Sequence, residues 1–274
     1  MSKTTDPADY QHSPHRVAAM AKDFPAGFAI PRHCHDRAQL IYAIAGVMRV
    51  TTDDGTWVVP PHRAVWVPAG EMHEIRHCGV VAMRTLYIDR AAAAALPQRC
   101  GVVEVLPLLR ELILAATEQD PGRADPSGRY PLLEQLILHE LATLPVMPLH
   151  LPLPRDKRLA AICTALLAAP ETNDTLDDWA DRVGASRRTL ARHFQVETGM
   201  SFGNWRQQLR LIEALSRLAA GQPVTVVAQD LGYDSPSAFT AMFRRTLGRA
   251  PSRYFSAEAG DIMAAARLMP VARV

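Results

Sequence analysis

The sequence has few cysteines and no long apolar run. Its four cysteines, Cys34, Cys78, Cys100 and Cys163, are scattered and form no CxxC pair. This spacing excludes a disulfide-rich scaffold and is typical of proteins kept in a reducing compartment. No apolar stretch reaches the roughly 18 residues of a membrane helix, and the polar residues 1–11 lack the apolar core of a signal peptide. We therefore expect a cytoplasmic protein with no membrane partner.

A large net charge is also missing, but the charge is unevenly distributed. The 274 residues carry a formal net charge of +2, and the hydrophobic share of 48% is ordinary for a protein that buries real cores. Residues 1–154 contain 14 lysines and arginines against 16 acidic residues, whereas residues 182–253 contain 11 arginines against four acidic residues. A polyanionic partner would therefore bind the second segment.

The length favours two domains joined by a connector. Four prolines between 145 and 154 favour extended chain, so we place a domain boundary near residue 150. The predicted divisions are a disordered leader at 1–15, a β-barrel at 16–95, a helical segment at 96–144, a proline-rich linker at 145–155, a helical domain at 156–258 and a tail at 259–274.

The first half contains two kinds of pattern. Between Phe28 and Asp89, short β-branched and aromatic runs are separated by turn residues, which indicates a β-sandwich or small barrel. After Asp89, apolar residues recur every three or four positions at 106–116 and again at 132–143, which indicates helices. Apolar residues surround most of these helices, so we expect them to be covered on one side by the barrel and on the other by a second subunit.

The C-terminal third contains an internal repeat. Ala180 and Ala228 each stand four residues before a glycine, and Ser186 and Ser235 each stand four residues before an apolar core position. The alanine permits close helix crossing, the glycine ends the first helix and the serine caps the second. This is the helix-turn-helix pattern, and a long helix opening at Ser201 separates its two copies.

Residues 176–255 resemble the DNA-binding domain of the AraC/XylS family of bacterial regulators. The most diagnostic stretches are Val227-Ala228, Leu231-Gly232-Tyr233, Ser235-Pro236-Ser237-Ala238-Phe239, Phe243-Arg244-Arg245, Leu247-Gly248 and Pro251-Ser252-Arg253-Tyr254. The resemblance implies an all-α domain with two helix-turn-helix units in consecutive major grooves. It also implies a homodimer, with the helical segment near 103–144 as the contact.

The resemblance also identifies the residues that would contact DNA. Arginine can bind guanine O6 and N7 bidentately, so we expect the first unit to contribute most of the base readout. The second unit has shorter side chains and should add phosphate and methyl contacts. The alternative is that these arginines form a solvated helix face. The expected contact residues are Arg187, Arg188, Ala191, Arg192, Pro236, Ser237, Thr240, Ala241, Arg244 and Arg245.

The β-rich half resembles the two cupin motifs. Gly27, His33, His35, Gln39 and Gly46 match G(x)5HxH(x)3E(x)6G except that glutamine replaces glutamate, and 68–73 matches PxGxxH. A glycine expected six residues before that second motif is absent. The resemblance implies a cupin-like barrel, so that the fold class is α+β with two domains.

The histidine spacing suggests a metal site. Alternate residues of a strand face the same side, so His33 and His35 can point into one barrel, where His73 can join them. Three imidazoles and the amide oxygen of Gln39 could hold a divalent transition metal. The alternative is a polar interior that binds an organic effector without metal. Cys34 should point away from the barrel.

The combined interpretation is a transcriptional regulator that is not an enzyme. The cupin domain would sense a small molecule or metal, and the helical domain would bind promoter DNA. Activation is favoured, with RNA polymerase as a further partner. One alternative is a cupin metalloenzyme, of the dioxygenase or isomerase type, with an accessory DNA-binding domain. Another is a constitutive DNA-binding protein whose cupin serves only as a dimerisation scaffold.

Overall fold

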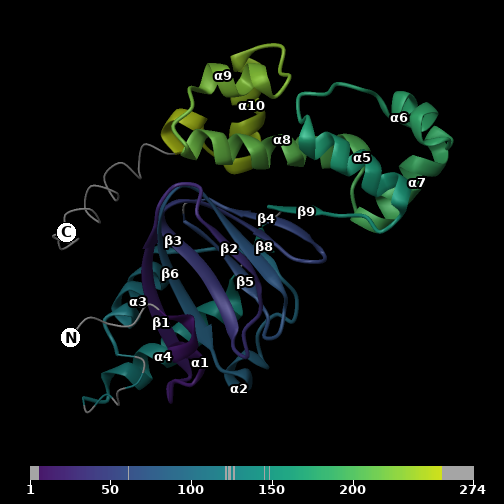
Figure 1. Cartoon of the computed structure of the whole chain (residues 1–274). Coiled ribbons are helices and arrows are strands. Elements are labelled where there is room, and N and C mark those ends of the chain that lie inside the picture. The colour runs from purple at the N-terminus through teal and green to yellow at the C-terminus, as the bar shows by residue number, and fades with distance from the viewer. Residues whose placement is uncertain are drawn as a thin grey trace. The chain divides into compact units, whose positions relative to one another are not determined.

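The computed structural model describes residues 6–60, 62–120, 122, 125, 127–144, 146–147 and 149–254. They form two compact units, and each is described by itself (Figure 1). The first contains the β-sheet and extends to Leu149, without the turn at 53–56. The second contains that turn and the helices from His150 onward. This arrangement confirms the predicted α+β fold class with two domains. The predicted tail at 259–274 lies outside the described residues.

The first unit is built on one antiparallel sheet. Strands follow the order β1-β6-β3-β5-β7-β8, while β2 pairs with β6 and β4 pairs with β3. The two longest strands, β3 and β6, pair over most of their length, with a change of register in the middle. The bounds are β1 (Val17–Phe24), β2 (Ala29–His33), β3 (Ala38–Thr51), β4 (Gly55–Val59), β5 (Arg63–Val67), β6 (His73–Ile88), β7 (Gly101–Glu104) and β8 (Val146–Met147).

Gly46 explains the change of register in β3. Its φ of +87° lies in the region that favours glycine, and a Cβ at this position would lie 2.3 Å from the carbonyl oxygen of Val80. The register of β3 against β6 shifts on both sides of Ala45. Such irregularities bend a strand and increase its twist. The bend lets the sheet curl around its interior (Figure 1).

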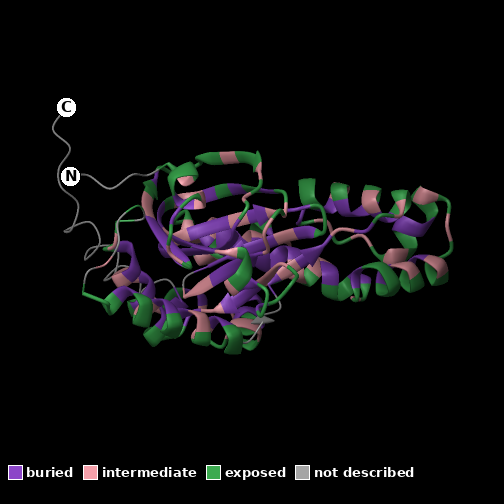
Figure 2. Ribbon diagram, turned by 90° about the horizontal axis from the view of Figure 1, so that it is seen from below, coloured by how far each residue is buried: buried purple, intermediate pink, exposed green. Residues whose placement is uncertain are grey.

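Three helices follow β6 in this unit: α2 (Arg90–Ala93), α3 (Pro107–Thr117) and α4 (Arg129–Thr143). Apolar side chains of α3 and α4 join those of the sheet in one buried core. The Tyr130 hydroxyl donates to the carbonyl oxygen of Val17 at 2.8 Å, and the Val17 amide donates to Glu134 Oε1 at 2.9 Å. The first residue of β1 is therefore fixed to α4. Figure 2 shows buried residues in the strands of the sheet and exposed residues on the outer helical turns.

The prediction of a disordered leader is wrong for the described residues of 1–15. Helix α1 (Pro7–Gln11) is capped by Asp6, and Tyr10 is only 1% exposed, with its ring 5.8 Å from that of Tyr87. The Arg37 guanidinium donates to the backbone carbonyls of residues 11, 13 and 15. A buried aromatic ring and a buried guanidinium order this polar segment, and composition alone does not reveal either contact.

Two further predictions need correction because strands occur where none was expected. Strand β7 lies within the predicted helical segment 96–144 and pairs with β5. The predicted linker at 145–155 includes β8, which pairs with β7, and β9 (His150–Pro152). Proline disfavours the helical conformation of the residue before it, and the extended chain that results is also the conformation of a strand.

The second unit contains helices α5 to α10. Their bounds are α5 (Lys157–Ala168), α6 (Leu176–Val183), α7 (Arg187–Thr198), α8 (Phe202–Ala219), α9 (Val224–Asp230) and α10 (Pro236–Leu247). Helix α8 has 18 residues, which makes it about 27 Å long. Its buried Trp205 donates from Nε1 to the carbonyl oxygen of Pro152 at 2.8 Å. Among the described helices, none has the length and hydropathy needed to cross a membrane.

Candidate functional site

Helices α6 and α7 form the first helix-turn-helix unit. Thr175 and Asp178 form a capping box at the start of α6, and Gly184 ends that helix with a φ of +64°. The Ser186 hydroxyl accepts a hydrogen bond from the Thr189 amide at 3.1 Å and so caps α7. The glycine and the serine therefore have the predicted roles.

Helices α9 and α10 form the second unit with the same local chemistry. Gly232 has a φ of +71° in the turn, and the Ser235 hydroxyl accepts from the Ala238 amide at 3.1 Å. Pro236 occupies the first turn of α10, where its missing amide proton costs no helical hydrogen bond. Gly248 ends the helix in the left-handed conformation.

Aromatic side chains bury one face of α7 and one face of α10. Phe194 of α7 and both Phe239 and Phe243 of α10 are fully buried. Because these rings fix one face of each helix, the opposite face is presented to solvent. Among the residues expected to contact DNA, Thr240 is partly buried and the rest are exposed: Arg187, Arg188, Ala191, Arg192, Pro236, Ser237, Ala241, Arg244 and Arg245.

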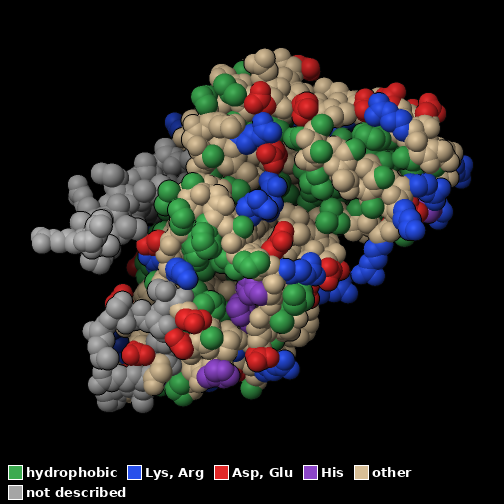
Figure 3. Space-filling view, in the orientation of Figure 1, with side chains coloured by type: hydrophobic (Ala, Val, Ile, Leu, Met, Phe, Trp, Pro, Cys, Tyr) green, Lys and Arg blue, Asp and Glu red, His purple; other side chains and the backbone are tan. Residues whose placement is uncertain are grey.

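The arginines of the first unit have local partners. Arg187 Nη1 lies 3.6 Å from Asp177 Oδ2, and both side chains are largely exposed. Arg192 Nη2 lies 2.9 Å from His193 Nε2. Exposed contacts of this kind are weak, so a DNA phosphate or base can compete with them. Figure 3 shows lysine and arginine side chains gathered over this part of the surface.

The buried guanidinium of Arg210 connects the segment before the first helix-turn-helix unit with the turn of the second. The sequence pattern did not predict this role. Arg210 of α8 donates to the carbonyl oxygens of Pro170, Glu171 and Thr172 and to Asn173 Oδ1, at 2.9 to 3.1 Å. Burial lowers the pKa of Arg210. Its guanidinium carbon also lies 5.8 Å from the centre of the Tyr233 ring. An arginine within the apolar stripe of a helix is the signal that could have identified it.

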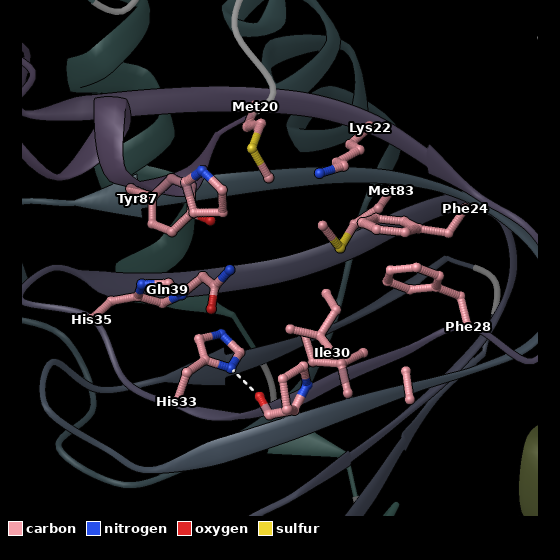
Figure 4. A pocket seen from close by; sticks show the side chains of 14 residues that line it. Met20, Lys22, Phe24, Phe28, Ile30, His33, His35, Gln39, Met83 and Tyr87 are labelled. Atoms are coloured by element: carbon pink, nitrogen blue, oxygen red, sulfur yellow. Dashed lines mark hydrogen bonds between the residues drawn. The ribbon is translucent and has the colours of Figure 1, made fainter.

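The second candidate site is a cavity of about 200 Å³ in the β-rich unit. Figure 4 shows the side chains that line it, with the histidines at one end and two phenylalanines at the other. The apolar lining comes mainly from Met20, Phe24, Phe28, Ile30, Ile75 and Met83. The polar lining comes from Lys22, His33, His35, Gln39 and Tyr87.

The structure brings the predicted histidines together. His33 and His35 lie at the end of β2 and just beyond it, and His73 is the first residue of β6, opposite His33. One ring nitrogen from each histidine lies within 4.8 Å of those of the other two. Gln39 Oε1 lies 3.1 Å from His73 Nε2. The three histidines of the predicted ligand set therefore lie together, and Gln39 lies beside His73.

The hydrogen bonds of His33 and His73 bear on which ring nitrogen of each could bind a metal. His33 Nδ1 lies 2.7 Å from the carbonyl oxygen of Pro31, and His73 Nδ1 lies 2.9 Å from that of Glu71. A neutral imidazole that donates from Nδ1 has an unprotonated Nε2. If His73 donates from Nδ1 to Glu71, its Nε2 and Gln39 Oε1 are two acceptors facing each other at 3.1 Å. A cation bound by both atoms would resolve this conflict.

His35 adds a ring nitrogen without a hydrogen-bond partner among the described residues. This nitrogen, Nε2, is buried. Burial lowers the pKa of His35 to about 4, with a smaller contribution from His33, and burial also lowers the pKa of His73 to about 4. Both imidazoles are therefore neutral near pH 7, the state in which histidine binds a metal. These residues fit a divalent transition metal.

Several residues that line the cavity were not predicted from the sequence, mainly because its pattern did not reveal β1 as a strand. Lys22 and Phe24 lie on β1, and Met83 and Tyr87 lie on the paired part of β6. The run from Val17 to Phe24 contains three alanines and no clear turn signals, so its pattern was weak. Cys34 is exposed and does not line the cavity, as expected for a residue between two inward-facing histidines.

Another departure from the cupin motifs has a structural counterpart. His62 stands six residues before Pro68, where the motif has a glycine, and its φ is +57°. It is the only residue other than glycine with a positive φ among those described. The backbone keeps the left-handed turn although the glycine has been replaced.

Comparisons with known proteins match both domains of the chain. Residues 22–142 match the AraC-like ligand binding domain, and residues 179–257 match a helix-turn-helix domain. The HTH-type transcriptional regulator NimR of Escherichia coli is 38% identical over 251 residues, which cover 90% of this chain and 91% of NimR. The regulatory protein SoxS of the same species is 36% identical over 80 residues, 29% of this chain and 75% of SoxS.

Among solved structures, fatty-acid-bound ToxT from Vibrio cholerae is similar over 89% of this chain and 96% of its own, with 11% identity and a TM-score of 0.36. The relation to NimR extends over nearly the whole of both sequences, and the two matched domains account for the two units of the fold. The chain therefore belongs to the AraC family of transcriptional regulators, with an N-terminal AraC-like ligand-binding domain and a C-terminal helix-turn-helix DNA-binding domain.

Proposed function

We propose that the first helix-turn-helix unit reads the bases of the promoter and that the second mainly anchors the protein on the phosphates. The observation that carries the proposal is the difference between two exposed faces. Helix α7 presents Arg188 and Arg192 beside Ala191, whereas α10 presents Pro236, Ser237, Thr240 and Ala241. Arginine reaches base edges with two donors, whereas the short side chains of α10 offer single contacts.

The experiment is a titration of the protein with a promoter fragment and with unrelated DNA at several salt concentrations. Loss of base readout weakens binding to the promoter but not to unrelated DNA, whereas loss of a phosphate contact weakens binding to both. If an Arg188→Ala/Arg192→Ala variant weakened both equally, this division of roles would be wrong.

We further propose that a small-molecule effector binds in the cavity of the β-rich unit. The cavity is mostly apolar with a few convergent polar groups, as is usual for ligand sites. Binding of the effector would change DNA affinity through a coupling free energy, typically 1–3 kcal/mol, or about 5- to 150-fold. A ligand screen that monitors promoter affinity tests this proposal, and an affinity that no ligand changes would favour a constitutive DNA-binding protein.

We also propose that His33, His35, His73 and Gln39 hold a divalent transition metal. The facing acceptors of His73 and Gln39 support this assignment. The test is elemental mass spectrometry of untagged protein beside a His33→Ala/His73→Ala variant. One metal per chain, absent from the variant, is the expected result. Because Gln39 replaces the carboxylate of the cupin motif, we infer that the site serves sensing rather than catalysis.

Self-association is proposed to involve α4. Leu132 and Leu136 are 61% and 49% exposed and lie one turn apart on the side of α4 away from the core. A second copy of the chain would cover these side chains, and a dimer would bind two half-sites. Sedimentation of a Leu132→Glu/Leu136→Glu variant tests this, because the variant should be monomeric if α4 forms the interface.

Reporter transcription with and without the protein shows whether the protein activates or represses its promoter.

A further inference from the structure

A second group of metal-ligand side chains lies in the helical unit, where α7 meets the start of α5. His193 and Glu197 stand four residues apart on α7, and Asp156 is the residue that caps α5. Residues four apart share one face of a helix, so the imidazole and the carboxylate are neighbours on α7. One ligand atom from each of the three residues lies within 4.8 Å of those of the other two. Two carboxylates and one imidazole therefore gather at one place.

The spacing between His193 and Asp156 suits a bound ion better than a hydrogen bond. His193 Nδ1 lies 3.7 Å from Asp156 Oδ2, which is too long for a hydrogen bond. Tetrahedral zinc, with bonds of about 2.0–2.2 Å to nitrogen and oxygen, places neighbouring ligand atoms about 3.4 Å apart. The two side chains are 27% and 20% exposed, so they have room to rotate by the small amount that this spacing requires.

Backbone amides hold both carboxylates in place. Glu197 Oε2 accepts from the amides of Arg155 and Asp156 at 2.7 and 3.0 Å. Asp156 Oδ1 accepts from the amides of Arg158 and Leu159 at 2.9 and 3.2 Å, and the hydrogen bond from Leu159 lowers the pKa of Asp156. Glu197 Oε1 has no hydrogen-bond partner among the described residues. Carboxylates that bind metals are usually oriented by such hydrogen bonds, which here leave one oxygen of Glu197 for an ion.

Two arginines beside the group would compete with an ion. Arg158 Nη2 lies 3.4 Å from Asp156 Oδ2, and Arg192 Nη2 lies 2.9 Å from His193 Nε2. A metal bound at Nδ1 leaves the ring proton of His193 on Nε2, so the contact with Arg192 would be lost. Both arginines are exposed, and ionic contacts of exposed arginines contribute little free energy. A divalent ion can therefore replace these two contacts at low cost.

We propose that Asp156, His193 and Glu197 bind a divalent transition metal of the zinc type, with water completing its coordination. Zinc accepts imidazole and carboxylate ligands, and sites with three protein ligands take water at the fourth position. The imidazole favours zinc over magnesium or calcium, which prefer oxygen ligands alone. All three ligands lie in the helical unit, so this site is separate from the histidines of the β-rich unit. The ion would connect α7, which carries the exposed arginines, to the start of α5.

The test is titration calorimetry of the full-length protein with Zn²⁺. The His33→Ala/His73→Ala variant lacks the metal site proposed for the β-rich unit, so the Zn²⁺ that it binds reports on the helical unit. In this variant we expect one Zn²⁺ per chain to bind and Mg²⁺ to bind far more weakly. No Zn²⁺ binding at about 100 µM, or Mg²⁺ binding as tightly as Zn²⁺, would overturn the proposal.

Further variants assign the bound Zn²⁺ to these ligands. Adding His193→Ala should weaken Zn²⁺ binding at least about tenfold, because loss of even an outer partner of a metal site costs about 10- to 100-fold in affinity. Glu197→Gln keeps an oxygen that accepts from the two amides but removes the ligand charge, so it should weaken Zn²⁺ binding and preserve the fold. His139→Ala is the matched control, because His139 is exposed on α4 and lies outside the group. Unchanged Zn²⁺ affinity after His193→Ala would contradict the assignment.

Thermal unfolding and a metal count keep the result independent of any one variant. Zn²⁺ should raise the unfolding temperature of His33→Ala/His73→Ala, and the rise should vanish when His193→Ala is added. Elemental mass spectrometry after equilibration with Zn²⁺ should find one metal fewer per chain in His193→Ala than in the wild type. Equal metal counts in these two proteins would overturn the proposal even if the variant in the β-rich unit failed to fold.

Discussion

The two helix-turn-helix units have the same local geometry in different surroundings. Gly184 and Gly232 occupy equivalent turns with φ values of +64° and +71°. A Cβ on Gly184 would meet no atom within 4 Å, whereas a Cβ on Gly232 would lie 2.6 Å from the carbonyl oxygen of Glu171. The turn of the first unit therefore faces open space, and the turn of the second is packed against the segment that leads into the first.

The side chains near the two turns show the same contrast between a packed second helix-turn-helix unit and an exposed first one. Tyr233, next to the second turn, faces the buried guanidinium of Arg210, which also holds the carbonyl groups of 170–172. The first unit instead presents exposed arginines on α7. Repetition of a motif thus does not imply repetition of a role. One copy can serve sequence recognition while the other is integrated into the body of the domain.

The largest effect should come from removing the group that joins the two units. Arg210→Met leaves three carbonyls and an amide oxygen without their donor, so we expect the free energy of unfolding to fall by about 3–5 kcal/mol. Urea denaturation of the full-length protein measures this change in the free energy of unfolding. Arg206→Met removes one hydrogen bond, to the carbonyl of Asp174, and should cost about 1 kcal/mol. If the two variants lost equal free energy of unfolding, Arg210 would not connect the two helix-turn-helix units.

The two glycines allow the contrast in surroundings to be tested directly. Both Gly184→Ala and Gly232→Ala place a side chain in the left-handed region, which costs about 1–2 kcal/mol. Gly232→Ala also forces a contact with the backbone of Glu171, so its total loss should reach about 3 kcal/mol. Thermal or urea unfolding gives both values. Similar losses for the two variants would show that the second turn is as free as the first.

The proposed division of readout predicts a difference in DNA affinity. Arg192→Ala should weaken binding to the promoter by about 5- to 150-fold, corresponding to the 1–3 kcal/mol of a bidentate base contact. Ser237→Ala in α10 removes a single hydroxyl, and its effect should stay within about threefold. Fluorescence anisotropy on labelled promoter DNA measures both. A larger effect of the serine variant would reverse the roles of the two units.

The smallest expected effect concerns the phosphates. Arg244→Gln at the end of α10 should weaken binding to promoter and unrelated DNA by the same modest factor. It should also reduce the slope of log affinity against log salt concentration by about 1. Titrations at four salt concentrations provide the slope. A selective loss on the promoter would instead indicate that Arg244 reads a base.

The sequence was most informative where function depends on local chemistry. The glycine and serine of each turn were predicted because their roles are decided by the residues themselves, and the histidines because their spacing on a strand requires them to share a face. Arg210, Lys22 and the packing of Gly232 were not predicted. Each depends on a partner many residues away, and no local pattern records such a contact. Strand β1 was not predicted for a related reason. Its alanines have little strand preference of their own, and they form a strand here through pairing with β6.

Strand β1 has a consequence for how ligand binding would be measured. Its first residue, Val17, is bonded to Tyr130 and Glu134 of α4, while Lys22, five residues along the same strand, lines the cavity. Five residues of strand span about 17 Å. If two copies associate through α4 and effector binding changes that association, thermodynamic reciprocity requires that association change effector affinity by the same factor. The apparent dissociation constant of the effector would then depend on protein concentration, and titrations at nanomolar and micromolar protein would give different values for one molecule.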